Sequence, residues 1–318
     1  YIRQVMMEVM KHKMNEQKID VLIPVYCPGK EFESMLERLE TQNYPIHRII
    51  VMHTIDGRNL DQYVEKYKNI IIVEVEKEEF DHGGTRDKGI RSSEADIIVC
   101  MTQDACPADD ELIAELVWAM KEPDVEVAYA RQLPRPEASI LEQYTRQFNY
   151  PKESCIKSLE DLRQLGIKTF FCSDVCAAYD RKAYIENGGF EKKTIFNEDM
   201  IYAAGVIKRG KKIYYNAEAK VIHSHNYNFK QQLTRNFDMA VSQAQHPEIF
   251  ANVSSEKEGM KLVKNTVKYL IKNKQPLLIV KFFVDCIAKY TGYFLGKRYR
   301  KLPEKLLLKC TMNPRYWN

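Results

Sequence analysis

Apolar positions along residues 19–130 fall into two alternating kinds of segment. Runs in which nearly every residue is apolar predict buried strands, and segments with apolar residues at helical spacing predict helices. The predicted strands are 19–25, 48–53, 70–75, 96–101 and 125–130, and the predicted helices are 31–40, 59–67, 84–93 and 109–120. Because apolar strands that alternate with helices are typical of a parallel sheet covered on both faces, the pattern predicts an α/β fold.

Parallel sheets bind their ligands beyond the carboxyl ends of the strands. We therefore expect the loops after Val25, His53, Val75 and Met101 to surround one crevice. The pattern is less regular beyond residue 130. There the predicted helices are 140–149, 158–166, 181–187 and 198–209, and the predicted strands are 169–179, 212–215 and 220–225.

The segment 276–296 is rich in large apolar residues but also contains Lys281, Asp285 and Lys289. Their four-residue spacing places these charges on one face of a helix. A membrane-spanning helix would bury them at a cost of about 2.5–3.5 kcal/mol each. The pattern therefore predicts an amphipathic helix that lies on a surface and keeps its charges in water.

The composition of the 318 residues, with 45% apolar and 29% charged, excludes a disordered or fibrous chain. The formal charge of +4 is too small to indicate nucleic-acid binding, but it is unevenly distributed. Residues 261–318 contain fourteen Lys and Arg against Asp285 and Glu304, a net of +12, which leaves −8 for the first 260 residues. We expect residues 260–310 to bind an anionic membrane surface. The alternative is a helix packed on the core or in a homo-oligomer interface.

The eight cysteines include no CxxC pair, and several lie in apolar runs where a free thiol behaves as a small hydrophobic group. With no signal-peptide pattern at the start, the sequence predicts a cytoplasmic protein, peripheral on the inner face of the cell membrane. We expect an N-terminal extension at 1–17, a catalytic domain at 18–255 and a basic amphipathic helical tail at 256–318.

Two groups of polar residues at predicted strand ends suggest nucleotide binding. Tyr26 follows the first strand, where its ring could stack on a base, although a plain strand-to-helix turn would also place it there. In the string 80–89, Gly83 and Gly84 begin a helix and could direct N–H groups at an anion. Arg86 could reach a diphosphate as a fork donor, and His82 could bond a phosphate or a sugar hydroxyl.

Two further groups supply carboxylates. Asp104 follows an apolar strand and is placed to bind a divalent cation through oxygen, unless it serves only the turn. Glu198 and Asp199 open a helix, where acids often only complement the dipole, but one of the two is free to act as a base. His223 and His225 alternate on a predicted strand and would share a face. No nearby third nitrogen or sulfur ligand supports a hydrolytic zinc site.

The strings 81–86, 102–105 and 197–199 together resemble family 2 glycosyltransferases over roughly residues 18–250. Within that family they are similar to bacterial rhamnosyltransferases that build cell-wall or capsular polysaccharides. The resemblance implies the GT-A fold, a Rossmann-like and mostly parallel sheet flanked by helices, here with a C-terminal basic helical extension. It also implies transfer of L-rhamnose from dTDP-β-L-rhamnose, with inversion, to a hydroxyl of a growing cell-surface polysaccharide or its lipid-linked precursor.

The resemblance assigns roles to these residues. Asp199 matches the family's general base, with Glu198 and His223 on the acceptor side. Asp104 matches the last acid of a metal-binding DxD motif whose first acid is replaced by Thr102, and the cofactor is Mg²⁺ or Mn²⁺. His225, or alternatively His223, would complete the metal ligands. The positions assigned to the nucleotide-sugar donor are Pro24, Tyr26, Thr54, Asp56, His82, Gly83, Gly84, Arg86, Gln103 and Asp104.

Three alternatives remain at this level. The same fold could use a UDP-hexose donor. The family usually has a pair of acids after the second strand to bind the nucleoside, and here residues 53–56 replace that pair, so the residue that recognises the base is open. The chain could also be a non-catalytic subunit that binds nucleotide sugars, in which case Asp199 would be dispensable. A nucleotidyltransferase is disfavoured because the loop 26–30 contains one glycine rather than a glycine-rich basic sequence.

Overall fold

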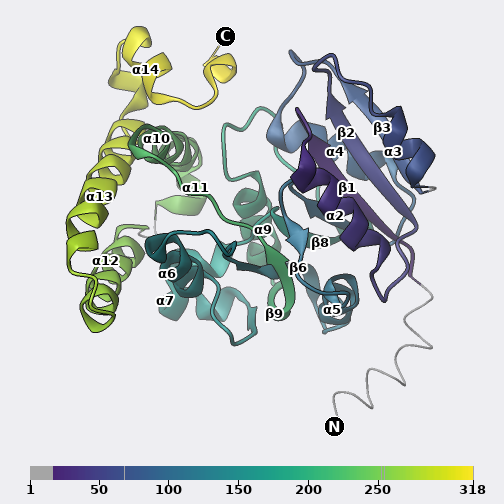
Figure 1. The fold of residues 1–318 in the computed structure, drawn as a ribbon, viewed down its shortest axis with the longest axis horizontal. Coiled ribbons are helices and arrows are strands. Elements are labelled where there is room, and N and C mark those ends of the chain that lie inside the picture. Colours follow the sequence, from purple (N-terminus) through teal and green to yellow (C-terminus); the bar gives the residue numbers. More distant parts are fainter. Residues whose placement is uncertain (1–16, 68, 252, 254, 318) are drawn as a thin grey trace.

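The computed structural model describes residues 17–67, 69–251, 253 and 255–317 (Figure 1). The extension expected at 1–17 lies outside these residues except for Gln17. The described chain forms a nine-stranded sheet with helices on both faces and a further layer of C-terminal helices beside it.

The strands are β1 (Ile19–Val25), β2 (Arg48–Thr54), β3 (Ile70–Val75), β4 (Ile97–Met101), β5 (Cys106–Pro107), β6 (Val125–Leu133), β7 (Cys155–Lys157), β8 (Cys176–Asp180) and β9 (Lys212–Ile222). The helices are α2 (Lys30–Glu40), α3 (Asp61–Lys66), α4 (His82–Ser92), α5 (Leu112–Ala119), α6 (Ile140–Asn149), α7 (Leu162–Leu165), α8 (Arg181–Glu186), α9 (Glu198–Lys208), α10 (Phe229–Gln245), α11 (Pro247–Phe250), α12 (Ser255–Lys272), α13 (Leu277–Gly296) and α14 (Glu304–Cys310). Short 3₁₀ helices are η1 (Leu159–Asp161), η2 (Gly166–Phe170), η3 (Tyr299–Lys301) and η4 (Pro314–Trp317).

The strand order is β3-β2-β1-β4-β8-β6-β9-β5, and β7 pairs with the outside of β9. The first four strands pair in parallel, as the sequence predicts, and β6 is parallel to β9. β8 runs antiparallel between β4 and β6. The predicted α/β fold with a mostly parallel sheet is confirmed.

Burial on both faces explains the near-continuous apolar strands. In β1, Val21 and Ile23 belong to a core with Phe32 of α2, whereas Leu22 belongs to the core on the opposite face with Ile90 of α4. Parallel register then places the carboxyl ends of neighbouring strands side by side, with Val25 opposite His53. Polar residues that follow these strands are therefore brought to one edge of the sheet.

The predicted strand 169–179 is wrong over its first half. Residues up to Phe170 form η2, and β8 begins only at Cys176. The buried ammonium of Lys157 donates hydrogen bonds to the carbonyls of Lys168 and Phe171, so this backbone finds its partners outside the sheet. The predicted helix 158–166 is instead divided among η1, α7 and η2.

The two strands predicted at 212–215 and 220–225 form one strand, β9, which ends at Ile222. Its pairing with β6 is irregular after Asn216, whose buried side chain donates to the carbonyl and carboxylate oxygens of Glu115. His223 and His225 consequently lie in the segment after the strand. The prediction that these residues belong to a strand is therefore wrong, although both imidazoles do lie against the same carboxylate, that of Asp104.

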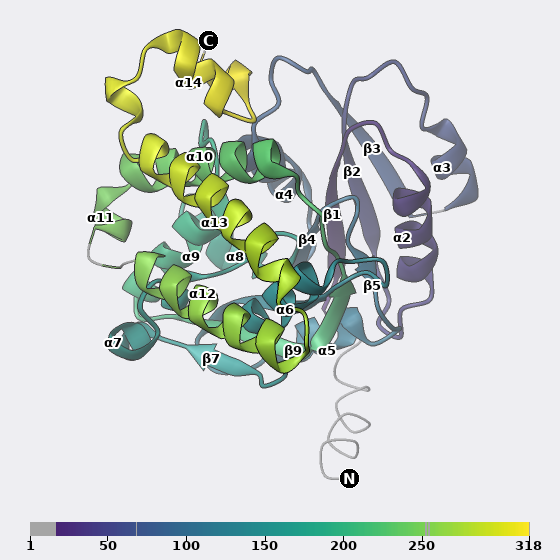
Figure 2. The same cartoon turned by 60° about the vertical axis from the view of Figure 1, so that its left-hand side comes forward.

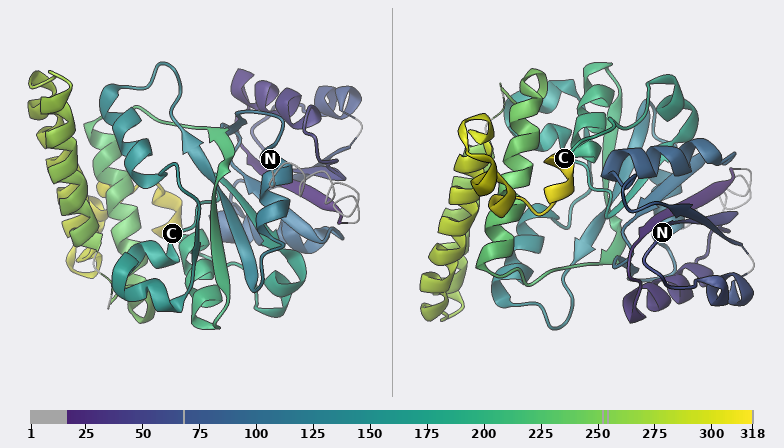
Figure 3. Two further views of the ribbon diagram at one scale, coloured as in Figure 1. Left: turned by 90° about the horizontal axis from the view of Figure 1, so that it is seen from below. Right: turned by 90° about the horizontal axis from the view of Figure 1, so that it is seen from above.

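Helices α12, α13 and α14 follow the sheet and form the outer layer (Figures 2 and 3). α13 packs on α10, and Gly292 and Gly296 allow it to approach the backbone at Leu233 and Phe237 more closely than a Cβ would tolerate. α12 contacts α6 through stacked Tyr144 and Tyr269 rings, whose centroids lie 4.3 Å apart. Within the described ranges, no helix has both the length and the apolar character needed to cross a membrane. The expected domain boundary near residue 255 stays a prediction.

Candidate active site

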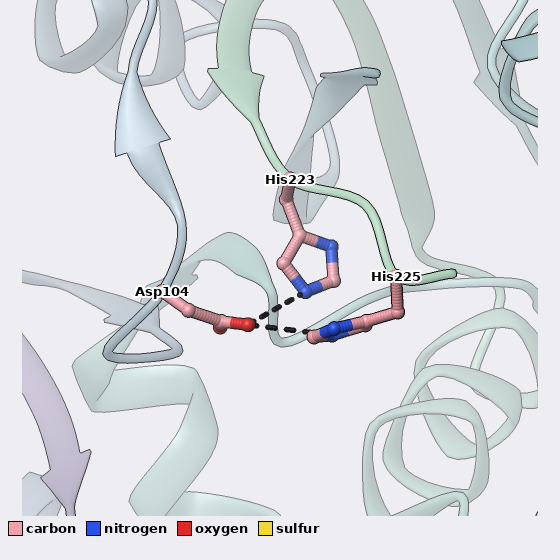
Figure 4. A group of neighbouring side chains, drawn as sticks. All are labelled: Asp104, His223 and His225. Carbon is pink, nitrogen blue, oxygen red and sulfur yellow. Dashed lines mark ion pairs between the residues drawn. The ribbon is translucent and has the colours of Figure 1, made fainter. Parts of the chain in front are cut away.

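Antiparallel pairing of β5 with β9 brings Asp104 next to two histidines (Figure 4). Cys106 lies opposite Ile222, so the turn before β5 faces the segment after β9. Oδ2 of Asp104 lies 3.4 Å from Nε2 of His223 and 3.3 Å from Nε2 of His225. One ligand atom from each residue lies within 4.8 Å of the others. The structure thus assembles three potential metal ligands from two distant parts of the chain.

The electrostatics of this group suit a divalent cation. Although burial acts in the opposite direction, hydrogen bonding and charge from His223 lower the pKa of the Asp104 carboxyl. Burial lowers the pKa of His223, and burial together with His223 lowers that of His225 to about 4. At neutral pH the group therefore offers an ionised carboxylate and two uncharged imidazoles, which are the protonation states that bind metal.

The residues after β1 and β2 also lie near one another. The Gln103 side chain donates to the Tyr26 carbonyl at 2.9 Å and accepts the Tyr26 N–H at 2.8 Å, so it fixes the end of β1 against the loop after β4. Tyr26 keeps 43% of its surface exposed. Pro24 lies within β1, one residue before its end.

Thr54 and Asp56 lie at and just beyond the end of β2. The hydroxyl of Thr54 is buried without a hydrogen-bond partner in the described residues. The Asp56 carboxylate accepts the N–H groups of Cys27 and Arg58, and these bonds outweigh burial and lower its pKa to about 2. Asp56 therefore ties the loop after β1 to the loop after β2. The predicted contacts of both residues with a donor stay predictions.

The glycines at the start of α4 have packing roles in this structure. The Gly84 N–H donates to the Asp81 side chain at 2.6 Å, which caps the helix. A Cβ on Gly83 would collide with the carbonyl of Glu191. His82 begins the helix with its ring against Phe80, and burial lowers its pKa. The anion-binding role of this helix start stays a prediction.

Arg86 is buried between two carboxylates rather than exposed. Nη1 lies 3.0 Å from Oε1 of Glu198, and Nε lies 3.3 Å from Oδ2 of Asp174. The guanidinium also donates to the His82 carbonyl at 3.0 Å. A side chain committed to these partners links α4, α9 and the loop before β8. Its predicted contact with a diphosphate stays a prediction.

Asp199 occupies the first turn of α9, directly after an unusual backbone conformation. Asn197 has a φ of 65°, in the left-handed region that Asn adopts more readily than most residues. The Asp199 carboxylate accepts the N–H of Met200 at 2.7 Å on Oδ1 and the N–H of Asp174 at 3.1 Å on Oδ2. Two backbone donors from different segments therefore fix its orientation.

The surroundings of Asp199 raise its pKa, which suits a general base. Burial, followed by the neighbouring charges of Glu198 and Asp174, raises its pKa well above the ordinary range of an aspartate. Burial also raises the pKa of Asp174 to about 6, in spite of Arg86. Three acids thus surround one arginine, and this excess of negative charge favours proton uptake at Asp199.

We call Asp104, His223 and His225 the metal-type group. A path of hydrogen-bonding groups leads from it to Asp199. Nδ1 of His223 lies 3.0 Å from Oε1 of Gln132, and the Gln132 amide donates to the Ser173 hydroxyl at 3.0 Å. The backbone N–H of the next residue is the one that bonds to Asp199. Asp104 and Asp199, 95 positions apart in the sequence, are therefore linked through a few contacts.

Sequence reasoning missed several residues of this site. Gln132, Arg146 and Asp174 carry no motif of their own, and only the fold places them between the two acids. Arg146 donates to Gln132 and Glu142. Arg235 of α10 lies with its guanidinium 4.8 Å from the Phe196 ring, and its charge contributes to lowering the pKa of His225. A basic residue in the second turn of α10, ten positions after His225, was the available signal.

Residues 20–188 match the glycosyl transferase family 2 pattern. The chain belongs to glycosyl transferase family 2. It is 37% identical over 306 residues to the O-antigen chain rhamnosyltransferase RfbN of Salmonella typhimurium, covering 95% of this chain and 96% of that protein. It is 38% identical to the O-antigen chain rhamnosyltransferase WbaN of Salmonella anatum, covering 94% and 95%. The predicted membership of family 2, with likeness to bacterial rhamnosyltransferases, is confirmed.

Solved structures confirm the GT-A-like fold of this family 2 glycosyltransferase. The mannosyltransferase PcManGT from Pyrobaculum calidifontis, in complex with GDP-Man and Mn²⁺, superposes with a TM-score of 0.57 at 14% identity, covering 95% of this chain and 83% of that one. S. aureus TarS 1-349 in complex with UDP-GlcNAc gives a TM-score of 0.54 at 15% identity, covering 89% and 92%. At these identities the likeness concerns the fold alone.

Proposed function

We propose that this glycosyltransferase moves L-rhamnose from dTDP-β-L-rhamnose to a hydroxyl of a growing O-antigen-type polysaccharide, with inversion at the anomeric carbon. The observation that carries the chemistry is the link between the group at Asp104 and the partly buried carboxylate of Asp199. The full-length likeness to two O-antigen chain rhamnosyltransferases supports the sugar and the class of acceptor.

Asp104, His223 and His225 would hold the cation that the donor diphosphate needs. A divalent cation there would neutralise the negative charge that grows on the leaving diphosphate. Two imidazoles favour Mn²⁺ over Mg²⁺, because Mg²⁺ prefers oxygen ligands. His223 thus contributes on the metal side rather than beside Glu198, while Gln103 holds Tyr26 in place for the nucleotide.

Asp199 would accept the proton of the acceptor hydroxyl as its oxygen attacks C1 from the face opposite the diphosphate. That direction of attack is what inverts the anomeric configuration. A raised pKa suits this task, because a base works best when its pKa lies near the working pH. The N–H groups of Asp174 and Met200 fix the carboxylate, so its position does not depend on the substrate.

Arg235 is the side chain we assign to the leaving group. Its guanidinium lies over the rings of Phe196 and Tyr227, and it is not among the ion pairs of the described residues. Its charge contributes to lowering the pKa values of both His82 and His225, so it lies close enough to act on both. A cation in that place can bind the diphosphate that departs.

The acceptor class also has a spatial consequence. We propose that the growing glycan is carried on a lipid, and that the basic C-terminal region keeps the enzyme peripheral at the inner face of the membrane. The net charge of +12 over residues 261–318 supports this placement.

A donor panel with the purified protein tests the proposal. We expect release of dTDP from dTDP-rhamnose in the presence of Mn²⁺ and a synthetic glycan acceptor, with an α-rhamnoside as product by NMR. Asp199→Asn should lose roughly 10²–10⁴-fold in kcat while still binding dTDP. Preference for UDP-glucose or UDP-galactose would assign a UDP-hexose donor instead. Near-normal turnover by Asp199→Asn would refute the base assignment.

A further inference from the structure

Helix α13 presents apolar side chains to solvent along its outer side. Leu277 is 88% exposed, Val280 70%, Ile287 60% and Tyr290 66%. Phe294 continues the row at 42%. Their spacing of three, seven, three and four residues keeps them on one side of the helix. We call this row the apolar stripe of α13.

The opposite side of α13 faces the protein and buries Phe282 and Ala288 beside small and charged residues. Gly292 and Gly296 lie against the backbone of α10. Asp285 and Lys289, which the sequence predicts to remain in water, are partly buried on this inner side. A surface helix of a globular protein ordinarily turns its apolar side inward. α13 buries Phe282 and Ala288 in this way but also exposes a second apolar row on its outer side. This apolar stripe therefore requires another partner.

Helix α12 lies next to α13 on the same outer face of the molecule (Figures 1 and 2). It bears Lys261, Lys264, Lys268 and Lys272, all exposed. Spacings of three and four residues align them along one side of the helix. Thr266 and Leu270, on the other side of α12, are buried against the body. We call these four residues the lysine row of α12.

We propose that the apolar stripe of α13 and the lysine row of α12 together form a docking face for an anionic lipid leaflet. Apolar side chains can enter the boundary between headgroups and acyl chains, while neighbouring lysines bind phosphates. A second copy of the chain is a poorer partner. Two-fold pairing through this face would bring two lysine rows toward each other, and like charges across an interface are costly.

Docking through α13 would also orient the catalytic base. α10 contacts both α13 and the segment that precedes Asp199. On that side the Ser242 hydroxyl donates to the Phe196 carbonyl at 2.6 Å, and the Asn197 amide donates to the Met239 carbonyl at 3.3 Å. The docking face is thus joined through one helix to the start of α9. Presentation of a lipid-linked acceptor to this base rests on the proposed function; lipid binding itself does not.

Vesicle sedimentation tests the docking face. We expect the full chain to sediment with phosphatidylglycerol-containing vesicles, to bind phosphatidylcholine vesicles much less, and to dissociate at high salt. Replacing the four lysines by Gln should weaken partitioning about fivefold for each lysine and roughly 600-fold together. Val280→Glu with Ile287→Glu should abolish sedimentation. Val64→Glu, at a position 45% exposed on α3, is the matched control and should bind normally.

Three results would overturn the proposal. They are failure of the unaltered protein to sediment, equal binding to neutral vesicles, and unchanged binding by the Val280→Glu, Ile287→Glu variant. A dimer in light scattering that this variant converts to monomer would assign the face to a second copy instead. Transfer to a short soluble acceptor should be unaffected by the variant, so a failure of docking and a failure of the proposed activity are distinguishable. Circular dichroism confirms that each variant is folded.

Discussion

The backbone N–H of Asp174 donates a hydrogen bond of 3.1 Å to Oδ2 of Asp199. The two residues belong to different segments, the loop before β8 and the first turn of α9. The side chain of Asp174 meanwhile accepts from Tyr179 at 2.6 Å and pairs with Arg86. One residue therefore both fixes the carboxylate of the proposed base and contributes to the charge around it.

Asp174→Asn should move the pH dependence of transfer. Asp199 acts as a base only when ionised, so kcat/KM should fall as the pH drops through its raised pKa. Asn keeps the backbone N–H and can still accept from Tyr179, but it removes a negative charge near Asp199. The pKa of Asp199 then falls, and the acidic limb of the kcat/KM profile moves to lower pH.

Asp87→Asn is the matched control for this experiment. Asp87 is also buried and also paired with an arginine of α4, Arg91, at 2.8 Å. It is absent from the groups that shift the pKa of Asp199. We expect this variant to lose stability but to keep the pH profile. An unmoved acidic limb in Asp174→Asn would show that Asp174 does not tune the base.

Changes at the metal-type group should reduce Mn²⁺ binding. Asp104→Asn and His225→Ala each remove a proposed ligand. Losing a residue that only hydrogen-bonds to a metal ligand already lowers metal affinity about 10- to 100-fold, so loss of a ligand itself should lower Mn²⁺ affinity by more than about tenfold. Electron paramagnetic resonance of free Mn²⁺ measures this without any turnover. His47→Ala, which breaks a histidine–aspartate pair with Asp20 elsewhere, should bind Mn²⁺ normally. Equal binding by all variants would place the cation at another site.

Arg235→Met should weaken the binding of dTDP. A charge-assisted hydrogen bond contributes about 1.5–3 kcal/mol, which corresponds to roughly 10- to 150-fold in Kd. Arg235→Lys keeps the charge and should recover part of this loss. Calorimetric titration of dTDP in the presence of Mn²⁺ provides the measurement. Arg209, which pairs with Glu126 at 2.8 Å, supplies a control as Arg209→Met. Unchanged dTDP affinity in Arg235→Met would remove this residue from the leaving-group site.

Gly292→Ala should destabilise the protein by about 1–3 kcal/mol, because the added Cβ would overlap the Leu233 carbonyl of α10. Gly259, in α12, has no atom within 4 Å of the position where a Cβ would lie. Gly259→Ala should therefore stabilise by roughly 0.5–1 kcal/mol through helix propensity. Urea unfolding measures both. Equal stability of Gly292→Ala and the unaltered protein would mean that α13 is free to move relative to α10.

Much of the fold could be predicted because the burial of a strand or helix leaves a local pattern of apolar residues in the sequence. A strand such as β1, covered on both faces, needs apolar side chains at nearly every position, and that run is visible without a structure. The motifs at Asp104 and Asp199 were visible for the same reason, since each follows or begins a recognisable element. The strand predicted at 169–179 does not form over its first half. The ammonium of Lys157, which precedes this segment in the sequence, donates hydrogen bonds to backbone carbonyls that would otherwise pair with a neighbouring strand.

By itself the sequence determined the alternation of strands and helices over residues 19–130, the family motifs and the amphipathic period of α13. Only the tertiary structure decided which side of α13 faces solvent. The helical period shows which residues share a side of the helix, but it does not show which side packs against the rest of the protein. The structure also decided that His223 reaches Asp104, that Arg86 is held by two carboxylates, and that Asp174 contacts Asp199. Each of these contacts depends on how strands pair and helices pack across long separations, and no local pattern encodes that pairing.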